Sequence, residues 1–422
     1  MNLTIARMGS AGDGVAETPN GPLHIPGALP GETVRTRQTG RDRAVLEAVL
    51  DPSPERVAPP CPHVADGCGG CALQHWDLGA QARWKRQRLA EALARAGFPD
   101  AEVAETVETP PASRRRADLA LKRAPDGAVA IGFHARGAAE VLDLRECHVL
   151  DPALVALLPA LRAVLKRLPA LARDGSAVVN LLDSGPDLLL RTDKPLDATG
   201  RRLLAAFGQA LGIPRIAWAQ GTKPGEGVEE TAAQTGPVRL MLGPVEVAPP
   251  PGAFLQASRE GEAAIIAAVL AGLPAKLPVR PHILDLYAGI GTLSFPLAAR
   301  GRVTAAEGSA AAASALEAAA NKAVARVRAV RRDLARQPYL PAELKAFDAV
   351  VLDPPYSGAA EQVAQIARSA LRHVVYVSCN PVALARDAGV LRGAGFAVTS
   401  ATPVDQFRWS SHLESVVHFA RQ

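Results

Sequence analysis

The sequence has few cysteines, no leader-like start and no long apolar run free of charge. Five cysteines among 422 residues are too few for a disulfide framework, so each is expected to be a buried thiol, a ligand or a nucleophile. The N-terminus lacks a charged start followed by an apolar core, which argues against a secretory signal. The most apolar helical stretch, 154–171, carries Arg162, Lys166 and Arg167 and is not a membrane span. We therefore expect a cytoplasmic protein without a membrane partner.

The composition is that of a multidomain globular protein with a basic surface. Hydrophobic residues make up 48%, the pI is about 9.1, and the length implies two or three domains. Trp84 stands among four basic residues within 83–88, and three arginines follow at 114–116. These clusters are either solvated faces or contacts to an acidic partner such as nucleic acid.

The pattern of apolar runs and turn residues divides the chain into three parts. Residues 1–52 contain short strands between glycines and predict a small barrel. Residues 53–245 hold four of the cysteines, a helix over about 78–96 and a mixed α+β domain. Residues 246–422 turn to strict β/α alternation from His282 onwards. The fold class is therefore α/β, with a doubly wound, mostly parallel sheet at the C-terminal end.

A glycine turn after the first strand of this sheet predicts a nucleotide-like cofactor. Asp285 ends the strand, Gly289 and Gly291 follow, and Glu307 ends the next strand, where an acid can hold ribose hydroxyls. Ser294 replaces the third glycine of the dinucleotide fingerprint, so the turn looks like the first motif of S-adenosylmethionine methyltransferases. A tight βα turn with a structural acid is the alternative.

Two further acids end the next strands. Asp333 ends the third strand and is expected at the adenine edge, and Asp353 ends the fourth, before two prolines that form a rigid corner. The alternative for Asp353 is a turn acid that caps the following helix.

Cys379 ends the fifth strand in the segment Ser-Cys-Asn-Pro and is the candidate nucleophile. We expect a helix N-terminus beside it to lower the thiol pKa, although a lone cysteine can also be an inert buried residue. Methylating carbon 5 of a pyrimidine requires a thiolate that attacks carbon 6 and a base that removes the carbon-5 proton. Glu414 is the candidate base and His412 the second choice.

In these segments the chain resembles the RNA 5-methyluridine (uracil-5) methyltransferases, and specifically the iron–sulfur-containing members that act on 23S rRNA. The matching segments are 253–256 (AFLQ), 285–291 (DLYAGIG), 353–355 (DPP), 377–381 (VSCNP) and 412–414 (HLE). The resemblance implies covalent catalysis by Cys379, proton removal by Glu414, and contacts of Gln256, Tyr287, Glu307 and Asp353 with S-adenosylmethionine. It also implies an RNA partner, rRNA rather than tRNA. The small barrel expected over residues 1–52 resembles the OB-like RNA-binding barrel often fused to this family. We expect a monomer.

The other four cysteines form a candidate metal site. Cys61, Cys68, Cys71 and the distant Cys147 are four soft ligands that suit zinc or an iron–sulfur cluster, unless they are unligated buried thiols. A [4Fe–4S] cluster is what the resemblance implies, because Cys-Pro-His and Cys-Gly-Gly-Cys match the iron–sulfur members of the family.

Two observations leave other functions open. Tyr356 completes an Asp-Pro-Pro-Tyr motif, where the family usually has Arg, and that motif is typical of amino-methyltransferases. An RNA-binding protein with an inactive methyltransferase domain is the non-enzymatic alternative. Trp84, Phe254 and Trp409 are candidates for stacking on bases or for the core.

Overall fold

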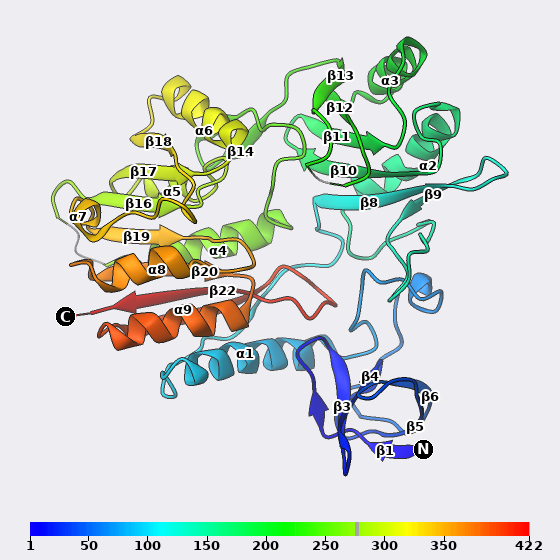
Figure 1. The fold of residues 1–422 in the computed structure, drawn as a ribbon, viewed down its shortest axis with the longest axis horizontal. Helices are drawn as coiled ribbons and strands as arrows, with labels where there is room; N and C mark the ends of the chain where they lie inside the picture. The colour runs from blue at the N-terminus through cyan, green and yellow to red at the C-terminus, as the bar shows by residue number, and fades with distance from the viewer. Residues whose placement is uncertain (224, 275–277, 422) are drawn as a thin grey trace.

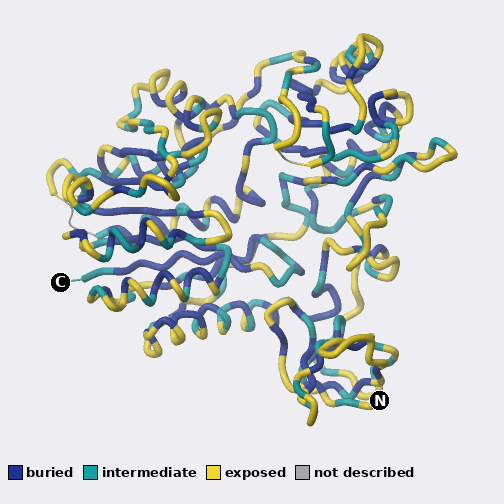
Figure 2. The backbone as a smooth tube through the Cα atoms, in the orientation of Figure 1, coloured by how far each residue is buried: buried dark blue, intermediate teal, exposed yellow. Residues whose placement is uncertain are grey.

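The computed structural model describes residues 1–223, 225–274 and 278–421. Figure 1 shows three parts: an eight-stranded sheet on one side, a six-stranded sheet beside it, and the N-terminal strands packed below both. In Figure 2 the strands of both large sheets are buried along most of their length, whereas the helices present exposed outer faces. None of the helices in these described ranges is long and apolar enough to cross a membrane.

The N-terminal part consists of two three-stranded antiparallel sheets. One holds β1 (Asn2–Thr4), β5 (Thr33–Gln38) and β6 (Ala44–Asp51), and the other holds β2 (Arg7–Met8), β3 (Asp13–Thr18) and β4 (Gly21–Pro26). The chain passes from one sheet to the other at Ile5, whose N–H bonds to Glu32, while the N–H of Ala6 bonds to Val15. Leu23, Ile25 and Val34 pack with Ile5 between the sheets. The small β part agrees with expectation, but a single OB-like barrel is not confirmed.

The central part is a six-stranded mixed sheet with two helices. The strand order is β13-β12-β11-β10-β8-β9, and only β11 and β12 are parallel. The strands are β8 (Arg116–Arg123), β9 (Val129–Gly132), β10 (Asp174–Leu182), β11 (Gly185–Thr192), β12 (Arg215–Gln220) and β13 (Glu230–Gln234). The helices α2 (Pro152–Arg167) and α3 (Ala198–Leu211) share its core. α2 buries leucines at helical spacing and is capped by Asp151, whose side chain accepts the N–H of Ala153.

The eight-stranded sheet carries the β/α alternation that the sequence predicts. Its order is β18-β17-β16-β19-β20-β22-β21-β7, with five parallel strands followed by the antiparallel β22. The strands are β16 (His282–Leu286), β17 (Arg302–Glu307), β18 (Val327–Arg331), β19 (Ala349–Leu352), β20 (His373–Ser378), β21 (Ala397–Asp405), β22 (Glu414–Ala420) and β7 (Val107–Glu108).

Helices cover both faces of this sheet. They are α1 (Leu78–Arg95), α4 (Arg259–Gly272), α5 (Ser294–Leu297), α6 (Ala310–Lys322), α7 (Pro341–Leu344), α8 (Ala360–Ala367) and α9 (Pro381–Gly393). Leu89 and Leu93 of α1 lie in the same core as α8 and α9 on one face, whereas α4 and α6 share the core of the other. The small hairpin β14 (Leu240–Leu242) and β15 (Val245–Val247) adjoins α6. Because β17 and β19 lie on opposite sides of β16, the strand order reverses there, and ligands bind at such a switch point.

Candidate active site

A cavity of about 430 Å³ lies at the switch point, beyond the carboxyl ends of β16, β17 and β19. Four of the five residues predicted for the cofactor line it: Gln256, Tyr287, Glu307 and Asp353. Asp285 and the exposed Phe254 line it as well. The sequence therefore located this cavity, although it gave no signal that singled out Phe254 for it.

Asp333, the fifth of these residues, is not among the residues that line the cavity. Its exposed carboxylate accepts the backbone N–H groups of Ala335 and Arg336, and it lies 3.6 Å from the Arg336 guanidinium. In this structure Asp333 caps its own turn, and the contact with adenine stays a prediction.

The turn after β16 brings backbone close to the cavity. Tyr287 has a φ of 62°, a left-handed conformation that is unfavourable for an aromatic residue and typical of functional sites. Gly291 has a φ of 103°, and a Cβ there would lie 2.5 Å from the Phe295 ring, so only glycine fits. The N–H of Gly289 donates to Glu307 (2.9 Å), which ties the turn to the end of β17.

Two carboxyl groups line this cavity, the fully buried Asp285 and the partly buried Asp353. Burial raises the pKa of both Asp285 and Asp353 to about 7. Ser294 donates to one oxygen of Asp285, while the other oxygen has no partner among the described residues. Uncompensated buried carboxylates are costly, so the cavity favours a positively charged ligand.

A second cavity, of about 480 Å³, adjoins the end of β20. It is lined by Cys379, His412 and Tyr356, and also by the four remaining cysteines. The nucleophile predicted from sequence and the predicted metal ligands therefore face one space.

The strand register brings Cys379 and Glu414 together. Ser378, the last residue of β20, lies opposite Ser415 of the antiparallel β22, and the Ser415 hydroxyl donates to Ser378 O (3.0 Å). The ladder ends at this pair: Cys379 follows β20 directly and Glu414 is the first residue of β22. The Glu414 charge also acts on the Cys379 thiol, so the two side chains lie near each other. The base predicted from sequence is therefore adjacent to the predicted nucleophile.

The expected lowering of the Cys379 pKa by a helix N-terminus is wrong for this structure. Burial, the Glu414 charge and the Asp353 charge raise the pKa of the thiol to about 11. The beginning of α9 does not compensate for two carboxylates. The thiol is protonated at neutral pH in the ligand-free enzyme.

Gln406 is a site residue that the sequence reasoning missed. Its side-chain amide donates to Gln256 Oε1 (2.7 Å) and to Glu414 Oε2 (3.0 Å). Gln256 in turn donates to Asp353 Oδ2 (3.3 Å). Burial and the Asp353 charge raise the pKa of Glu414 well above its usual range. A glutamine next to Asp405 at a strand end carries no motif signal, so only the structure reveals it.

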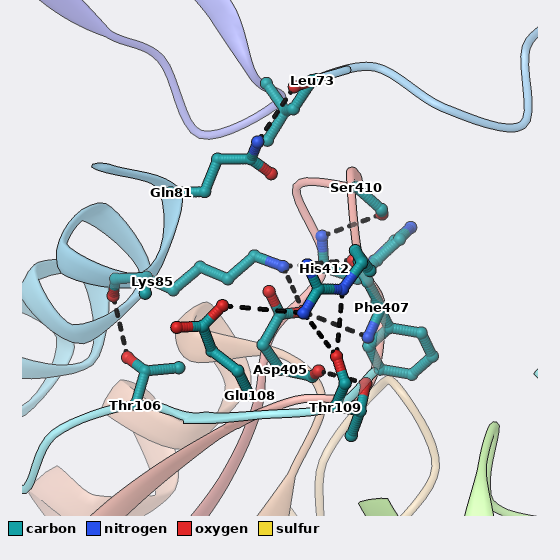
Figure 3. Close-up of polar contacts among 12 residues, drawn as sticks. Leu73, Gln81, Lys85, Thr106, Glu108, Thr109, Asp405, Phe407, Ser410 and His412 are labelled. Atoms are coloured by element: carbon teal, nitrogen blue, oxygen red, sulfur yellow. Dashed lines mark hydrogen bonds and ion pairs between the residues drawn. The ribbon is translucent and has the colours of Figure 1, made fainter. Parts of the chain in front are cut away.

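The loop between β21 and β22 is anchored on α1. Figure 3 shows the Lys85 side chain reaching from α1 to Asp405, with its ammonium also bonded to Phe407 O (3.1 Å). Both side chains of this ion pair are buried, and Asp405 also accepts the N–H of Phe407 (3.1 Å). Arg408 donates to Thr109 O beside β7. These contacts fix the loop that delivers Gln406 and Glu414.

The four cysteines predicted as metal ligands line one cavity but do not form a close group. Cys61, Cys68 and Cys71 are buried, and His63 accepts the N–H of Arg145 (3.1 Å), which holds the loop of Cys147 against the first cysteine segment. In residues 1–223, 225–274 and 278–421, however, no three His, Cys, Asp or Glu side chains form a group that could hold a metal ion. The metal assignment is not confirmed.

Comparisons with known proteins decide the family. Residues 275–422 match the family described as tRNA (Uracil-5-)-methyltransferase. The 23S rRNA (uracil(1939)-C(5))-methyltransferase RlmD of Chromohalobacter salexigens is 36% identical over 99% of this chain and 89% of its own length. The chain belongs to the RNA uracil-5-methyltransferase family. It is thus an enzyme, an RNA (uracil-5-)-methyltransferase, and this assignment favours carbon 5 over the amino-group alternative suggested by Tyr356.

Other members and one solved structure extend the similarity to the whole chain. A protein named as an uncharacterized RNA methyltransferase of Mesorhizobium japonicum is 41% identical over 98% of this chain and 96% of its own length. The crystal structure of the Pyrococcus abyssi tRNA (uracil-54, C5)-methyltransferase in complex with S-adenosyl-L-homocysteine has a TM-score of 0.75. It is 20% identical and covers 100% of both chains, so this uracil-5-methyltransferase shares its fold throughout.

Proposed function

We propose that this enzyme transfers a methyl group from S-adenosylmethionine to carbon 5 of a uridine in 23S rRNA, with Cys379 as nucleophile and Glu414 as base. The register of β20 and β22 carries the proposal, because it makes the thiol and the carboxylate neighbours. Asp353 lines the cofactor cavity while its charge acts on both Cys379 and Glu414. The methyl donor and the two reacting side chains therefore meet around Asp353.

The chemistry follows from the weakness of uracil carbon 5 as a nucleophile. The Cys379 thiolate forms a bond to carbon 6, and the electron pair of the ring double bond moves to give an enolate at carbon 5. Carbon 5 would then take the methyl group of S-adenosylmethionine, whose sulfur–methyl bond would break to leave S-adenosylhomocysteine. Glu414 accepts the carbon-5 proton, the double bond reforms, and the carbon–sulfur bond breaks to release the thiolate.

The residues around the switch point suit S-adenosylmethionine, which supplies a methyl group on a positively charged sulfur. The unpaired buried oxygen of Asp285 and the Asp353 carboxyl group that lines the cavity provide negative charge for a cationic ligand. Glu307, at the end of β17, is the acid for ribose hydroxyls. Gln256 and Tyr287 would complete the contacts within the cavity, and Asp333 would contact the adenine.

Trapping with 5-fluorouridine tests the covalent step. Fluorine on carbon 5 cannot leave as a proton, so the adduct between enzyme and RNA should persist on a denaturing gel when cofactor is present. Cys379→Ala should abolish the adduct. An adduct that survives this substitution, or its absence from the wild-type enzyme, would refute the role of Cys379.

Substitution of the base gives a complementary result. Glu414→Gln cannot accept the carbon-5 proton, so the enzyme should methylate once and retain the RNA covalently on ordinary uridine. Turnover should fall by roughly 100-fold or more. If Glu414→Gln turns over normally while His412→Gln stalls, His412 is the base.

The RNA target is inferred from the relative that this chain matches over nearly its full length. RlmD of Chromohalobacter salexigens is named for uridine 1939 of 23S rRNA, and we propose the equivalent uridine here. Mass spectrometry of 23S rRNA and tRNA from a deletion strain should show loss of one 5-methyluridine in the 23S rRNA alone. Loss from tRNA instead would overturn this target.

We also propose that Cys61, Cys68, Cys71 and Cys147 hold a [4Fe–4S] cluster. All four line one cavity, and burial is the main reason why the pKa of Cys61, Cys71 and Cys147 is raised, which a bound cationic group would reverse. Anaerobically purified protein should be brown, with about four iron atoms per chain. Colourless protein with zinc would refute the cluster.

A further inference from the structure

The side chain of Gln406 joins the cofactor cavity to Glu414. Gln406 is 5% exposed and lies at the beginning of the loop between β21 and β22. Its Oε1 accepts the backbone N–H of Ala257 (2.9 Å), while its Nε2 donates both to Gln256 and to Glu414. Gln256 and Ala257 lie about 150 residues away in the sequence, so the amide joins that segment to Glu414, eight residues after Gln406.

The orientation of this amide is determined by one backbone group. An N–H can only donate, so the atom of Gln406 that faces Ala257 must be the oxygen, and the NH2 group must face Gln256 and Glu414. The Gln256 oxygen then faces Gln406, and the Gln256 NH2 group faces Asp353. Gln406 therefore presents an N–H donor to the Glu414 carboxyl group, and Gln256 presents one to the Asp353 carboxyl group. Such donors favour the ionised form of a carboxyl group.

We propose that Gln406 is a positioning residue of the methyl transfer, which holds the base Glu414 and the Gln256–Asp353 pair in one hydrogen-bonded chain of fixed direction. This inference rests on the proposed function, in which Glu414 must be ionised to accept a proton. Gln406 occupies Oε2 of Glu414, whereas Oε1 has no partner among the described residues. Oε1 is thus the oxygen left for the carbon-5 proton.

The position of Gln406 depends on the anchor of the loop. Its neighbour Asp405 is held by Lys85 of α1, and Arg115 donates to Gln256 O (3.3 Å) from the start of the central sheet. The hydrogen-bonded side chains of Gln406 and Gln256 therefore lie between the buried cations Lys85 and Arg115, which belong to other parts of the molecule. A single side chain can be replaced without moving either one.

The test replaces Gln406 with methionine, which is similar in length and has no N–H donor. Glu414 then loses its donor, its pKa rises further, and the acid side of the kcat–pH profile should move to higher pH. At pH 7 kcat should fall about tenfold or more. The KM for S-adenosylmethionine should change by less than about threefold, because only one hydrogen bond to Gln256 is lost. Enzyme covalently bound to ordinary uridine RNA should accumulate, because elimination is slowed.

Gln362→Met is the matched control. Gln362 is also fully buried in the C-terminal part, and its amide bonds to the backbone of Tyr339 rather than to Gln256 or Glu414. This variant should lose stability without moving the acid side of the pH profile. If Gln406→Met is too unstable to assay, Gln406→Asn keeps the amide but withdraws it by one methylene, and it should shift the profile in the same direction.

The outcomes separate this inference from the proposed function. Failure of the wild-type enzyme to form an adduct with 5-fluorouridine RNA would remove the proposed function itself. A wild-type adduct, together with an unmoved pH profile and normal release in the Gln406 variant, would overturn the positioning role alone. A shift of equal size in Gln362→Met would also overturn it.

Discussion

At the scale of single residues, the carboxyl groups of Glu414 and Asp353 place Cys379 in a negatively charged environment. Burial, Glu414 and Asp353 raise the pKa of Cys379 to about 11, so the thiolate is scarce in the ligand-free enzyme. A positively charged cofactor beside Asp353 would offset part of this effect. The proposed nucleophile would then become more reactive when the methyl donor is bound.

The reactivity of Cys379 towards iodoacetamide tests this environment. In the ligand-free enzyme its alkylation rate should rise about tenfold per pH unit from pH 7 towards 11, because only the thiolate reacts. Glu414→Gln removes a negative neighbour, lowers the thiol pKa and should accelerate alkylation at pH 8. Exchange of the exposed Glu343 for glutamine should not. Peptide mapping by mass spectrometry distinguishes Cys379 from the other thiols, and equal rates in wild type and Glu414→Gln would contradict the argument.

Residue types at strand ends were predictable, but their interactions were not. Cys379, Glu307 and Asp353 each follow an apolar run, which is a local signal. The adjacency of Cys379 and Glu414 depends on the antiparallel pairing of β20 and β22, and the pKa of the thiol depends on burial. Gln406 has no local signal at all, since its partners at 256, 257 and 414 come together only in the folded chain.

At the scale of elements, α1 holds the loop between β21 and β22 in place. The buried Lys85–Asp405 pair joins α1 to the end of β21, and β7 adds a short strand beside β21. The sequence predicted α1 and most strands of the C-terminal sheet. It placed α1 in the 53–245 segment, and it could not show that α1 shares a core with α8 and α9, because that contact joins segments far apart in sequence.

Breaking this pair should be costly. Lys85→Met leaves the Asp405 charge buried without its partner and should lower the free energy of unfolding by about 3–5 kcal/mol in urea denaturation. Adding Asp405→Asn should restore part of the loss. Lys122→Met serves as control, because both side chains of the Lys122–Asp174 pair are half-exposed, at 50% and 46%, and the loss should stay below about 1 kcal/mol. Equal losses in the single and double variants would contradict the explanation.

At the scale of the whole molecule, the N-terminal strands, α1 and the beginning of α9 enclose a groove of about 560 Å³. Trp84 and Arg88 lie in it, with the Arg88 guanidinium 4.8 Å from the centre of the Trp84 ring. Pro381, two positions after the proposed nucleophile Cys379, also lines the groove. The groove therefore joins the N-terminal part to the active site, and a basic, aromatic lining is what single-stranded RNA requires. This favours the nucleic-acid interpretation of the cluster around Trp84.

Substitution of Trp84 tests whether RNA beside the target uridine occupies this groove. Trp84→Ala removes a stacking surface and should weaken binding of an RNA substrate roughly tenfold, whereas Trp84→Phe keeps an aromatic ring and most of the affinity. Arg95→Gln, on the exposed side of α1, should reduce the salt dependence of binding by about one phosphate contact. Affinity for S-adenosylmethionine should not change in any of the three variants, because neither Trp84 nor Arg95 lines the cofactor cavity. Equal RNA affinity in wild type and Trp84→Ala would mean that the tryptophan only packs against Trp76, and that the RNA reaches Cys379 by another path.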